Sequence, residues 1–321
     1  MSDELDTIVA ADNDKYMIRC ENLVKIYRVL GREATGRVAV KLSTGEPGGH
    51  NFLQPALIGD LVREVNGTIV ECNTAYAGRR SSSEEHWKAI EEHGFKAIAP
   101  CDIMDEEGDM AIPVTGGKHL KENYVGTHLK NYDSILMLSH FKGHAMAGLG
   151  GALMELLKES AQSQVERPGK GRRGKIQIHN SAKSEVFEDC FTADQDSFLE
   201  SMADADQSVM DFMGRENIVY INVANRLSVD CDCDSNPHDP EMADIGIFAS
   251  LDPVAVDQAC VDAVYHSPDE GKAALIERMA ACYPSVQIRF QDGDYEAVEE
   301  WILKKKVDVG FLSASTRQPF R

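Results

Sequence analysis

The sequence has no long hydrophobic run and no export signal. No apolar stretch in its 321 residues approaches the ~18 residues that a membrane helix needs. The first fifteen residues are acidic, and they lack the basic start and apolar centre of a signal peptide. The sequence therefore predicts a cytoplasmic protein without a membrane partner.

Positive charge is also scarce. Lysine and arginine number 33 against 53 acidic residues, which gives a formal net charge of −20. Nucleic acids and anionic membranes are bound through basic surfaces, so we expect no nucleic-acid partner. The acidic balance by itself indicates no more than solubility. Against this background, the basic cluster "RPGKGRRGK" at 167–175 stands out.

Disulfides are not expected, because the eight cysteines occur in a chain without an export signal. Six of them are isolated in the sequence. Cys231 and Cys233 lie together in "DCDCDSNPHDP", followed by His238. Thiolate and imidazole groups bind soft or borderline metal ions, so these three residues form a candidate metal site. A polar loop with two thiols is the alternative, since Cys-x-Cys spacing alone is a weak signal.

Apolar runs rich in β-branched residues alternate with helical patterns along the chain. This alternation predicts an α/β fold, a mostly parallel sheet with helices on both faces in three α/β/α layers. The expected strands are 37–43, 68–76, 96–103, 132–140, 217–224 and 245–250; the expected helices are 52–65, 81–95, 148–161, 196–214, 252–266 and 294–306. No linker is evident. We predict one domain over 1–321, with a long irregular excursion at about 161–190.

Ligands of parallel α/β sheets bind beyond the carboxyl ends of the strands. Three predicted strand-to-helix loops meet there: 44–51, 73–81 and 140–148. The first is glycine-rich, but it lacks the endings of a phosphate-binding P-loop and of a dinucleotide fingerprint. These positions predict a pocket for a small anionic molecule, with the following ligand-binding candidates: Lys41, Ser43, His50, Asn51, Asn73 and Asp257.

The stretch "LSHFKGHAMAGLGG", 138–151, contains two histidines four residues apart. Its glycines and its β-like start argue against one helix through both histidines, so we expect a strand end, a turn and a glycine-rich helix start. A helix N-terminus suits an anion. His140, Lys142 and His144 are the candidates for binding and proton transfer at near-neutral pH. The alternative is tight packing of the glycines, with both histidines engaged in structural hydrogen bonds.

A second group of candidate anion ligands lies in "GRRGKIQIH". Arg172, Arg173 and Lys175, with His179, could bind phosphate or carboxylate groups. A solvated surface loop is an equally good interpretation of this segment.

Taken together and in this order, several of these stretches resemble the domain-of-unknown-function family 362, whose members are described as iron–sulfur centre proteins. The resemblance rests on "VAVKLSTGEPGGHNFLQP", "ECNTAY", "GGKHLKENYVG", "LSHFKGHAMAGLGGAL", "GRRGKIQIH", "YINV", "DCDC" and "DIGIFASLDPVAVDQACVD". "HAMAGLGG" is also faintly similar to a stretch of nickel-pincer lactate racemases, which implies a similar pocket.

The chain departs from the family pattern in two ways. Relatives carry a ferredoxin-like module with two Cys-x-x-Cys-x-x-Cys runs, whereas 180–217 here contains only Cys190. No [4Fe–4S] cluster is therefore expected, because such a cluster needs several thiolates. Relatives also continue with lysine after "GGAL", where this chain has Met154.

Three functions remain open from the sequence. The first is an enzyme or cofactor-dependent protein that binds a small anion. The second is a metal-binding protein, with a metal ion as its possible cofactor. The third is a non-catalytic scaffold that has lost the iron–sulfur module. A homo-oligomer is possible in each case, and the sequence does not decide whether the protein is an enzyme.

Overall fold

The apolar runs predicted as strands form the centre of an eight-stranded sheet in the computed structural model. The structure describes residues 8–9, 18–20, 22–75, 78–157, 178 and 194–281. The strand order is β1-β2-β12-β11-β8-β3-β4-β5. Their bounds are β1 Ile8–Val9, β2 Ile18–Cys20, β3 Val38–Lys41, β4 Thr68–Glu71, β5 Cys101–Ile103, β8 Ser134–His140, β11 Ile218–Ala224 and β12 Gly246–Ser250.

The five strands from β11 to β5 are parallel, and β12, β2 and β1 extend the sheet in antiparallel pairing. The predicted mostly parallel sheet is thus confirmed. Its central strands are buried on both faces: all seven residues of β8 are buried. This explains why these strands appear as continuous apolar runs in the sequence rather than as alternating patterns.

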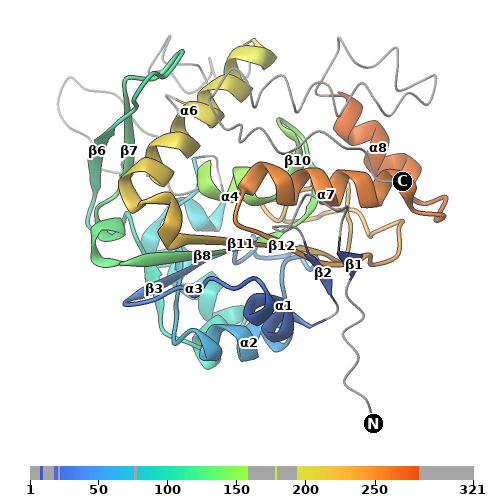
Figure 1. Cartoon of the computed structure of the whole chain (residues 1–321), viewed down its shortest axis with the longest axis horizontal. Helices are drawn as coiled ribbons and strands as arrows, with labels where there is room; N and C mark the ends of the chain where they lie inside the picture. Colours follow the sequence, from blue (N-terminus) through green and yellow to red (C-terminus); the bar gives the residue numbers. More distant parts are fainter. Residues whose placement is uncertain are drawn as a thin grey trace.

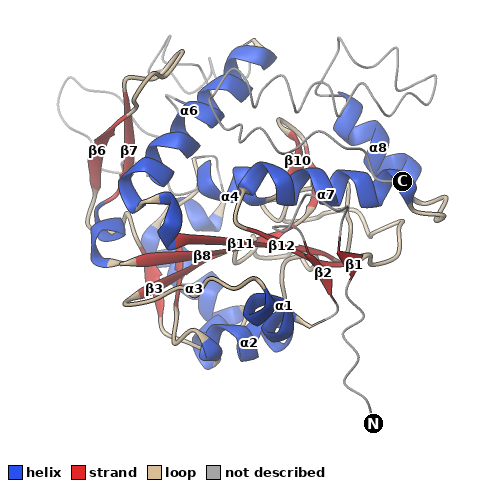
Figure 2. Cartoon of the chain, in the orientation of Figure 1, coloured by secondary structure: helices blue, strands red, loops and turns tan. Residues whose placement is uncertain are grey.

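Helices cover both faces of the sheet, which gives the predicted three-layer α/β/α arrangement (Figures 1 and 2). One face carries α1 Leu23–Val29, α2 Pro55–Glu64 and α3 Ser83–Glu92; the other carries α4 Ala152–Leu157, α6 Gln195–Met213 and α7 Pro253–His266. Successive strand side chains divide between the two layers. Ile135 and Met137 join the core on the α4–α6–α7 side, whereas Leu136 and Leu138 join the core on the α1–α2–α3 side.

Several smaller elements were not predicted. They are the hairpin of β6 Asp109–Pro113 and β7 Glu122–Gly126, the hairpin of β9 Lys142–His144 and β10 Gly148–Gly150, helix α8 Lys272–Ala281, and short 3₁₀ turns at Arg79–Ser81, Phe95–Ala97, Thr127–Asn131 and Arg215–Asn217. Helix α1 was also missed. The helix expected from Gly148 begins only at Ala152, because a second hairpin strand precedes it. The expected helix 294–306 lies outside the described residues.

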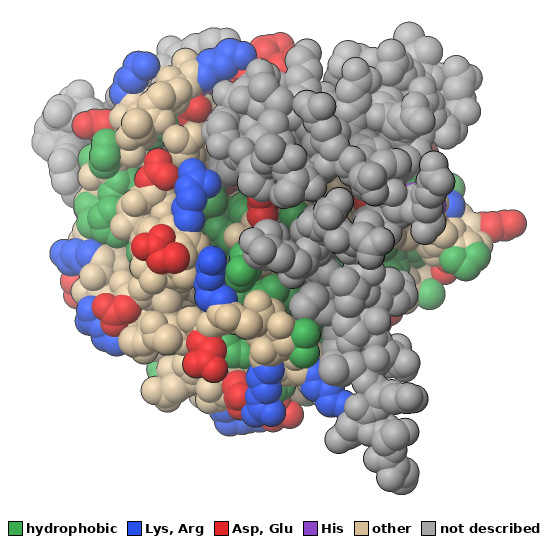
Figure 3. Space-filling view, viewed as in Figure 1, with side chains coloured by type: hydrophobic (Ala, Val, Ile, Leu, Met, Phe, Trp, Pro, Cys, Tyr) green, Lys and Arg blue, Asp and Glu red, His purple; other side chains and the backbone are tan. Residues whose placement is uncertain are grey.

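Among the described residues, no helix combines the length and apolar character required to cross a membrane. On the described part of the face in Figure 3, acidic and basic side chains lie interspersed over the helices. Exposed ion pairs on α2 and α3 include Arg63–Asp60 and Lys88–Glu84.

Asp206, on α6, is a buried carboxyl group whose protonation should affect stability. Burial, reinforced by nearby Asp257, raises its pKa well above the ordinary value. The folded state therefore keeps a proton that the unfolded state releases at about pH 4, so this group makes stability fall as pH rises above about 4. We expect Asp206→Asn to match the wild type near pH 4 and to exceed it by on the order of 1–3 kcal/mol at pH 8.

Urea unfolding across this pH range measures the effect. Asp211→Asn is the matched control, because Asp211 lies on the same helix but is 40% exposed in its ion pair with Arg215. That control should shift stability by less than about 1 kcal/mol. An Asp206→Asn variant that loses stability at pH 8 would contradict the prediction.

Candidate functional site

The candidate site lies beside β3, at the point where the order of the strands in the sheet reverses. From β3 the chain adds β4 and β5 on one side, while β8 and β11 lie on the other. The carboxyl ends of β3 and β8 therefore flank a topological switch point, the usual position of ligand sites in open α/β sheets. Lys41 ends β3, and His140 ends β8.

Five ionisable side chains form a buried cluster at this point, which we call the buried charge cluster: Lys41, His140, Lys142, Glu155 and Asp232. Lys41 Nζ lies 2.9 Å from Glu155 Oε2. Lys142 Nζ lies 2.9 Å from Asp232 Oδ2 and 3.9 Å from Glu155 Oε1. All of these side chains are at most 1% exposed, so the two ammonium groups meet the two carboxylates inside the protein.

Both ring nitrogens of His140 lie within hydrogen-bond distance of oxygen atoms. Its Nδ1 lies 2.8 Å from Asp232 Oδ1, and its Nε2 lies 2.7 Å from the carbonyl oxygen of Asn225. A carbonyl oxygen only accepts, so the Nε2 that faces it carries a proton. His140 and Lys142 thus contact Asp232 rather than the surface, and their predicted catalytic role stays a prediction.

Asp232 links the buried charge cluster to the two cysteines. It stands between Cys231 and Cys233, and its side chain is fully buried against His140 and Lys142. The backbone N–H of Cys233 donates to Cys231 Sγ at 3.3 Å. The Cys-x-Cys spacing therefore has a structural reason, since the middle residue anchors the loop and holds both thiols in place.

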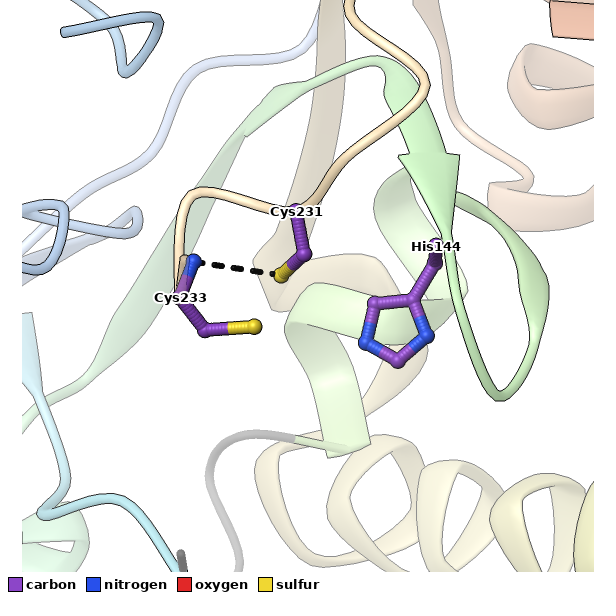
Figure 4. Close-up of side chains that lie close together, drawn as sticks. All are labelled: His144, Cys231 and Cys233. Carbon is purple, nitrogen blue, oxygen red and sulfur yellow. Dashed lines mark hydrogen bonds between the residues drawn. The ribbon is translucent and has the colours of Figure 1, made fainter. Parts of the chain in front are cut away.

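His144 completes a three-residue group with the cysteines. One donor atom from each of His144, Cys231 and Cys233 lies within 4.8 Å of the others. The imidazole comes from β9, and the sulfurs come from the loop after β11, facing one edge of the ring (Figure 4). His144 and Cys231 are buried, and Cys233 is half-buried. These side chains are the candidate metal ligands, and neither cysteine forms a disulfide.

His238, the third predicted metal ligand, is placed elsewhere. Its Nδ1 lies 2.6 Å from Asp230 Oδ2, its side chain is 77% exposed, and the hydrogen bond to Asp230 raises its pKa. The structure therefore groups Cys231 and Cys233 with His144 and leaves His238 on the outside of the loop.

Glycines allow two segments to enclose the cysteine loop. A Cβ on Gly48 would lie 2.5 Å from the carbonyl oxygen of Ser235, and one on Gly49 would lie 2.7 Å from that of Asp234. On the other side, a Cβ on Gly143 would overlap the backbone of Val229. The glycines of both stretches thus permit close backbone packing around the cysteines.

The predicted ligand residues His50 and Asn51 belong to this packing. His50 Nε2 lies 2.9 Å from Asp239 Oδ1, and Asn51 Nδ2 donates to the carbonyl oxygen of His238 at 3.0 Å. Both residues therefore connect the 43–51 loop to the cysteine loop.

Ser43 and Asn73 lie in a second buried network that the sequence did not reveal. Arg80 donates to Ser43 Oγ at 3.3 Å and to Glu71 Oε1 at 2.6 Å. Burial alone would raise the pKa of Glu71, but Arg80 and His86 hold it well below its usual range. Asn73 lies beside the same His86, 3.2 Å from its Nδ1. This network connects the loops after β3 and β4.

Asp257 stabilises the start of α4. Its carboxylate accepts hydrogen bonds from the N–H groups of Ala152 and Leu153 and from Asn222 Nδ2. Burial raises the pKa of Asp257 to about 6, while these hydrogen bonds act in the opposite direction. The structure thus places this predicted ligand residue at a helix cap. Asp252 caps α7 in the same way, since its side chain accepts hydrogen bonds from the N–H groups of Val254 and Ala255.

The remaining predictions fall outside the described residues: Arg172, Arg173, Lys175, His179 and Cys190. The expected loss of a ferredoxin-like module concerns the same part of the chain and stays a prediction.

Replacing Gly143 with alanine tests the packing of the hairpin against the cysteine loop. The added methyl group would overlap the backbone of Val229, which cannot move aside as a side-chain end could. We expect a loss of roughly 1–3 kcal/mol in the free energy of unfolding. Gly150→Ala, in the paired strand, is the control, because its Cβ would meet only Lys142 side-chain atoms, at 3.4 Å or more. Equal losses in the two variants, by urea denaturation, would argue against this role of Gly143.

The fold and the site together define an α/β protein with a thiol–imidazole group at the carboxyl edge of its sheet. The chain belongs to the family described as "Domain of unknown function (DUF362)", whose model matches residues 38–262. Comparison with curated proteins returned no match.

Among solved structures, the chain is similar to the lactate racemase apoprotein from Thermoanaerobacterium thermosaccharolyticum. The two share 13% sequence identity with a TM-score of 0.42, over 81% of this chain and 58% of that one. The match thus spans less than two thirds of the racemase.

Proposed function

We propose that this protein binds a thiophilic metal ion through His144, Cys231 and Cys233. The observation that carries the proposal is the convergence of one imidazole and two thiol donors within 4.8 Å, from two separate segments of the chain. Thiolate sulfur and imidazole nitrogen are the preferred ligands of Zn²⁺ and of other soft or borderline ions.

The dimensions of the group suit such an ion. Zn–S distances of about 2.3 Å place ligand atoms roughly 3.5–3.8 Å apart in a tetrahedral site. The donors would therefore have to approach each other by up to about 1 Å. Three protein ligands leave one coordination position for water or a small molecule, which is the pattern of metal sites that interact with substrates. The proposed setting is the cytosol, where thiols stay reduced.

Metal content and affinity test this function. The full-length protein, purified without a histidine tag, should bind one Zn²⁺ per chain in equilibrium dialysis with elemental analysis. Cys231→Ser, Cys233→Ser and His144→Ala should each weaken binding by on the order of a hundredfold or more.

Two controls separate this site from other donors. Cys101→Ser should leave binding unchanged, because burial raises the pKa of Cys101 to about 11 and that thiol lies on β5. His238→Ala should also leave it unchanged, since His238 contacts Asp230 instead. Sub-stoichiometric metal that Cys231→Ser does not alter would rule out the proposed function.

A small anionic ligand is the second candidate, and the switch point between β3 and β8 favours it. Such a ligand would occupy the open coordination position, because Lys41, His140 and Lys142 are already paired in the buried charge cluster. A thermal-shift screen of carboxylates and phosphates should find a ligand that stabilises the Zn²⁺-loaded protein. Equal stabilisation of the Cys233→Ser variant would place that ligand elsewhere.

A further inference from the structure

The ring of His144 is engaged by its own hairpin. The N–H groups of Met146 and Ala147 both point at His144 Nδ1, at 3.2 and 3.1 Å. These two residues lie in the turn between β9 and β10. A nitrogen that accepts hydrogen bonds holds a lone pair rather than a proton, so the neutral ring carries its proton on Nε2.

This arrangement is the reverse of what a metal-ligating histidine normally shows. Such a histidine binds the ion with one nitrogen and donates the N–H of the other to an acceptor. If Nε2 bound the ion, Nδ1 would carry the proton and would face two N–H donors. If Nδ1 bound the ion, its lone pair would no longer be available to the two N–H groups. Either nitrogen can therefore bind a metal only when both hydrogen bonds of the turn are lost.

We propose that metal loading rearranges the turn 145–147 of the β9–β10 hairpin. This inference rests on the proposed metal-binding function and adds a conformational change to it. Figure 4 shows the geometry behind it: the imidazole lies between the two sulfurs and the hairpin to which it belongs. On this proposal, both turn hydrogen bonds belong to the metal-free form.

Other parts of the molecule contact the turn and would respond to this change. Gln195 Nε2, at the start of α6, donates to the carbonyl oxygen of Met146 at 2.5 Å. Helix α8 packs against both strands of the hairpin. Gly148, directly after the turn, has φ +77°, in the left-handed region that glycine adopts without strain. Metal occupancy would thus reach α6 and α8 through the hairpin.

Nuclear magnetic resonance of the full-length protein tests the proposal, with Zn²⁺ as the probe. Without metal, the ring ¹⁵N signals of His144 should show a protonated Nε2 and an unprotonated Nδ1. Saturation with Zn²⁺ should replace this pattern with that of a metal-bound ring. Hydrogen exchange at the amides of Met146 and Ala147 should accelerate by about fivefold to tenfold or more, as expected for the loss of one hydrogen bond each.

Two controls make the result specific. Mg²⁺ should leave both readouts unchanged, since a hard ion prefers oxygen ligands. In Cys233→Ser, which should not load, added Zn²⁺ should not change the two amides.

Stoichiometric Zn²⁺ binding that depends on His144 but leaves both amides protected would overturn the inference while the proposed function stands. Absence of Zn²⁺ binding would overturn both.

Discussion

Asp232→Asn should lower the free energy of unfolding by about 3–5 kcal/mol, the usual effect of removing one partner from a buried ion pair. Asp232 is the acidic partner of two basic side chains, with Lys142 Nζ at 2.9 Å and His140 Nδ1 at 2.8 Å. Asparagine keeps the shape of the side chain but not its charge. The buried ammonium group of Lys142 would then lose its main counter-charge.

Urea denaturation at neutral pH measures this effect. Asp239→Asn is the matched control, because Asp239 lies in the same loop and pairs with a histidine, yet its side chain is 90% exposed. Its loss should cost less than about 1 kcal/mol. Asp232→Asn should also weaken Zn²⁺ binding, since Asp232 holds the segment that carries both cysteines. A loss of stability no larger than the control's would show that the buried charge cluster is not structural.

The layered fold was predictable because burial on both faces leaves a direct trace in sequence. Strand β8 contains the unbroken apolar run "ILML", and its neighbour β11 the run "IVYI". The β9–β10 hairpin left no such trace. Its strands, "KGH" and "GLG", contain no β-branched residue and are three residues long. These strands form because they pack against the loop after β11 and against α8. The intrinsic strand preference of their residues does not explain them.

The candidate site was only partly predictable for a similar reason. Cys231 and Cys233 stand out by their spacing, and His238 is the nearest histidine in the sequence. The structure groups the cysteines with His144 instead. Strand β8 pairs with β11, and this pairing brings the segment after β8, which contains His144, next to the cysteine loop. Pairing between residues that are 114 positions apart, as in Lys41 and Glu155, has no sequence signal in a single chain.

The glycine-rich loop 44–51 shows that the same glycine pattern can accommodate either a ligand or another segment of the chain. Glycines at 48 and 49 suggest room for a ligand next to the backbone. In the structure, the neighbour that approaches closely is the chain itself, at Ser235 and Asp234. The sequence could not distinguish these two cases, since both require the same missing side chain.

Glu155→Leu should destabilise the protein by about 3–5 kcal/mol, and adding Lys41→Met should restore most of that loss. Glu155 Oε2 lies 2.9 Å from Lys41 Nζ, and both side chains are at most 1% exposed. Leucine alone leaves the ammonium group of Lys41 buried without its carboxylate. When methionine also replaces Lys41, an apolar pair of similar volume fills the space, and neither charge of this pair remains to be desolvated.

A double-mutant cycle in urea, with Lys41→Met as the second single variant, measures this coupling. The two substitutions should be strongly non-additive, with an interaction energy of about 2 kcal/mol or more. Additive losses would mean that Lys41 and Glu155 do not depend on each other. The double variant should still bind Zn²⁺, because Lys142 and His140 keep Asp232, and with it the two cysteines, in place. Retained binding would show that the Lys41–Glu155 pair supports the fold beneath the site and contributes no group to the site itself.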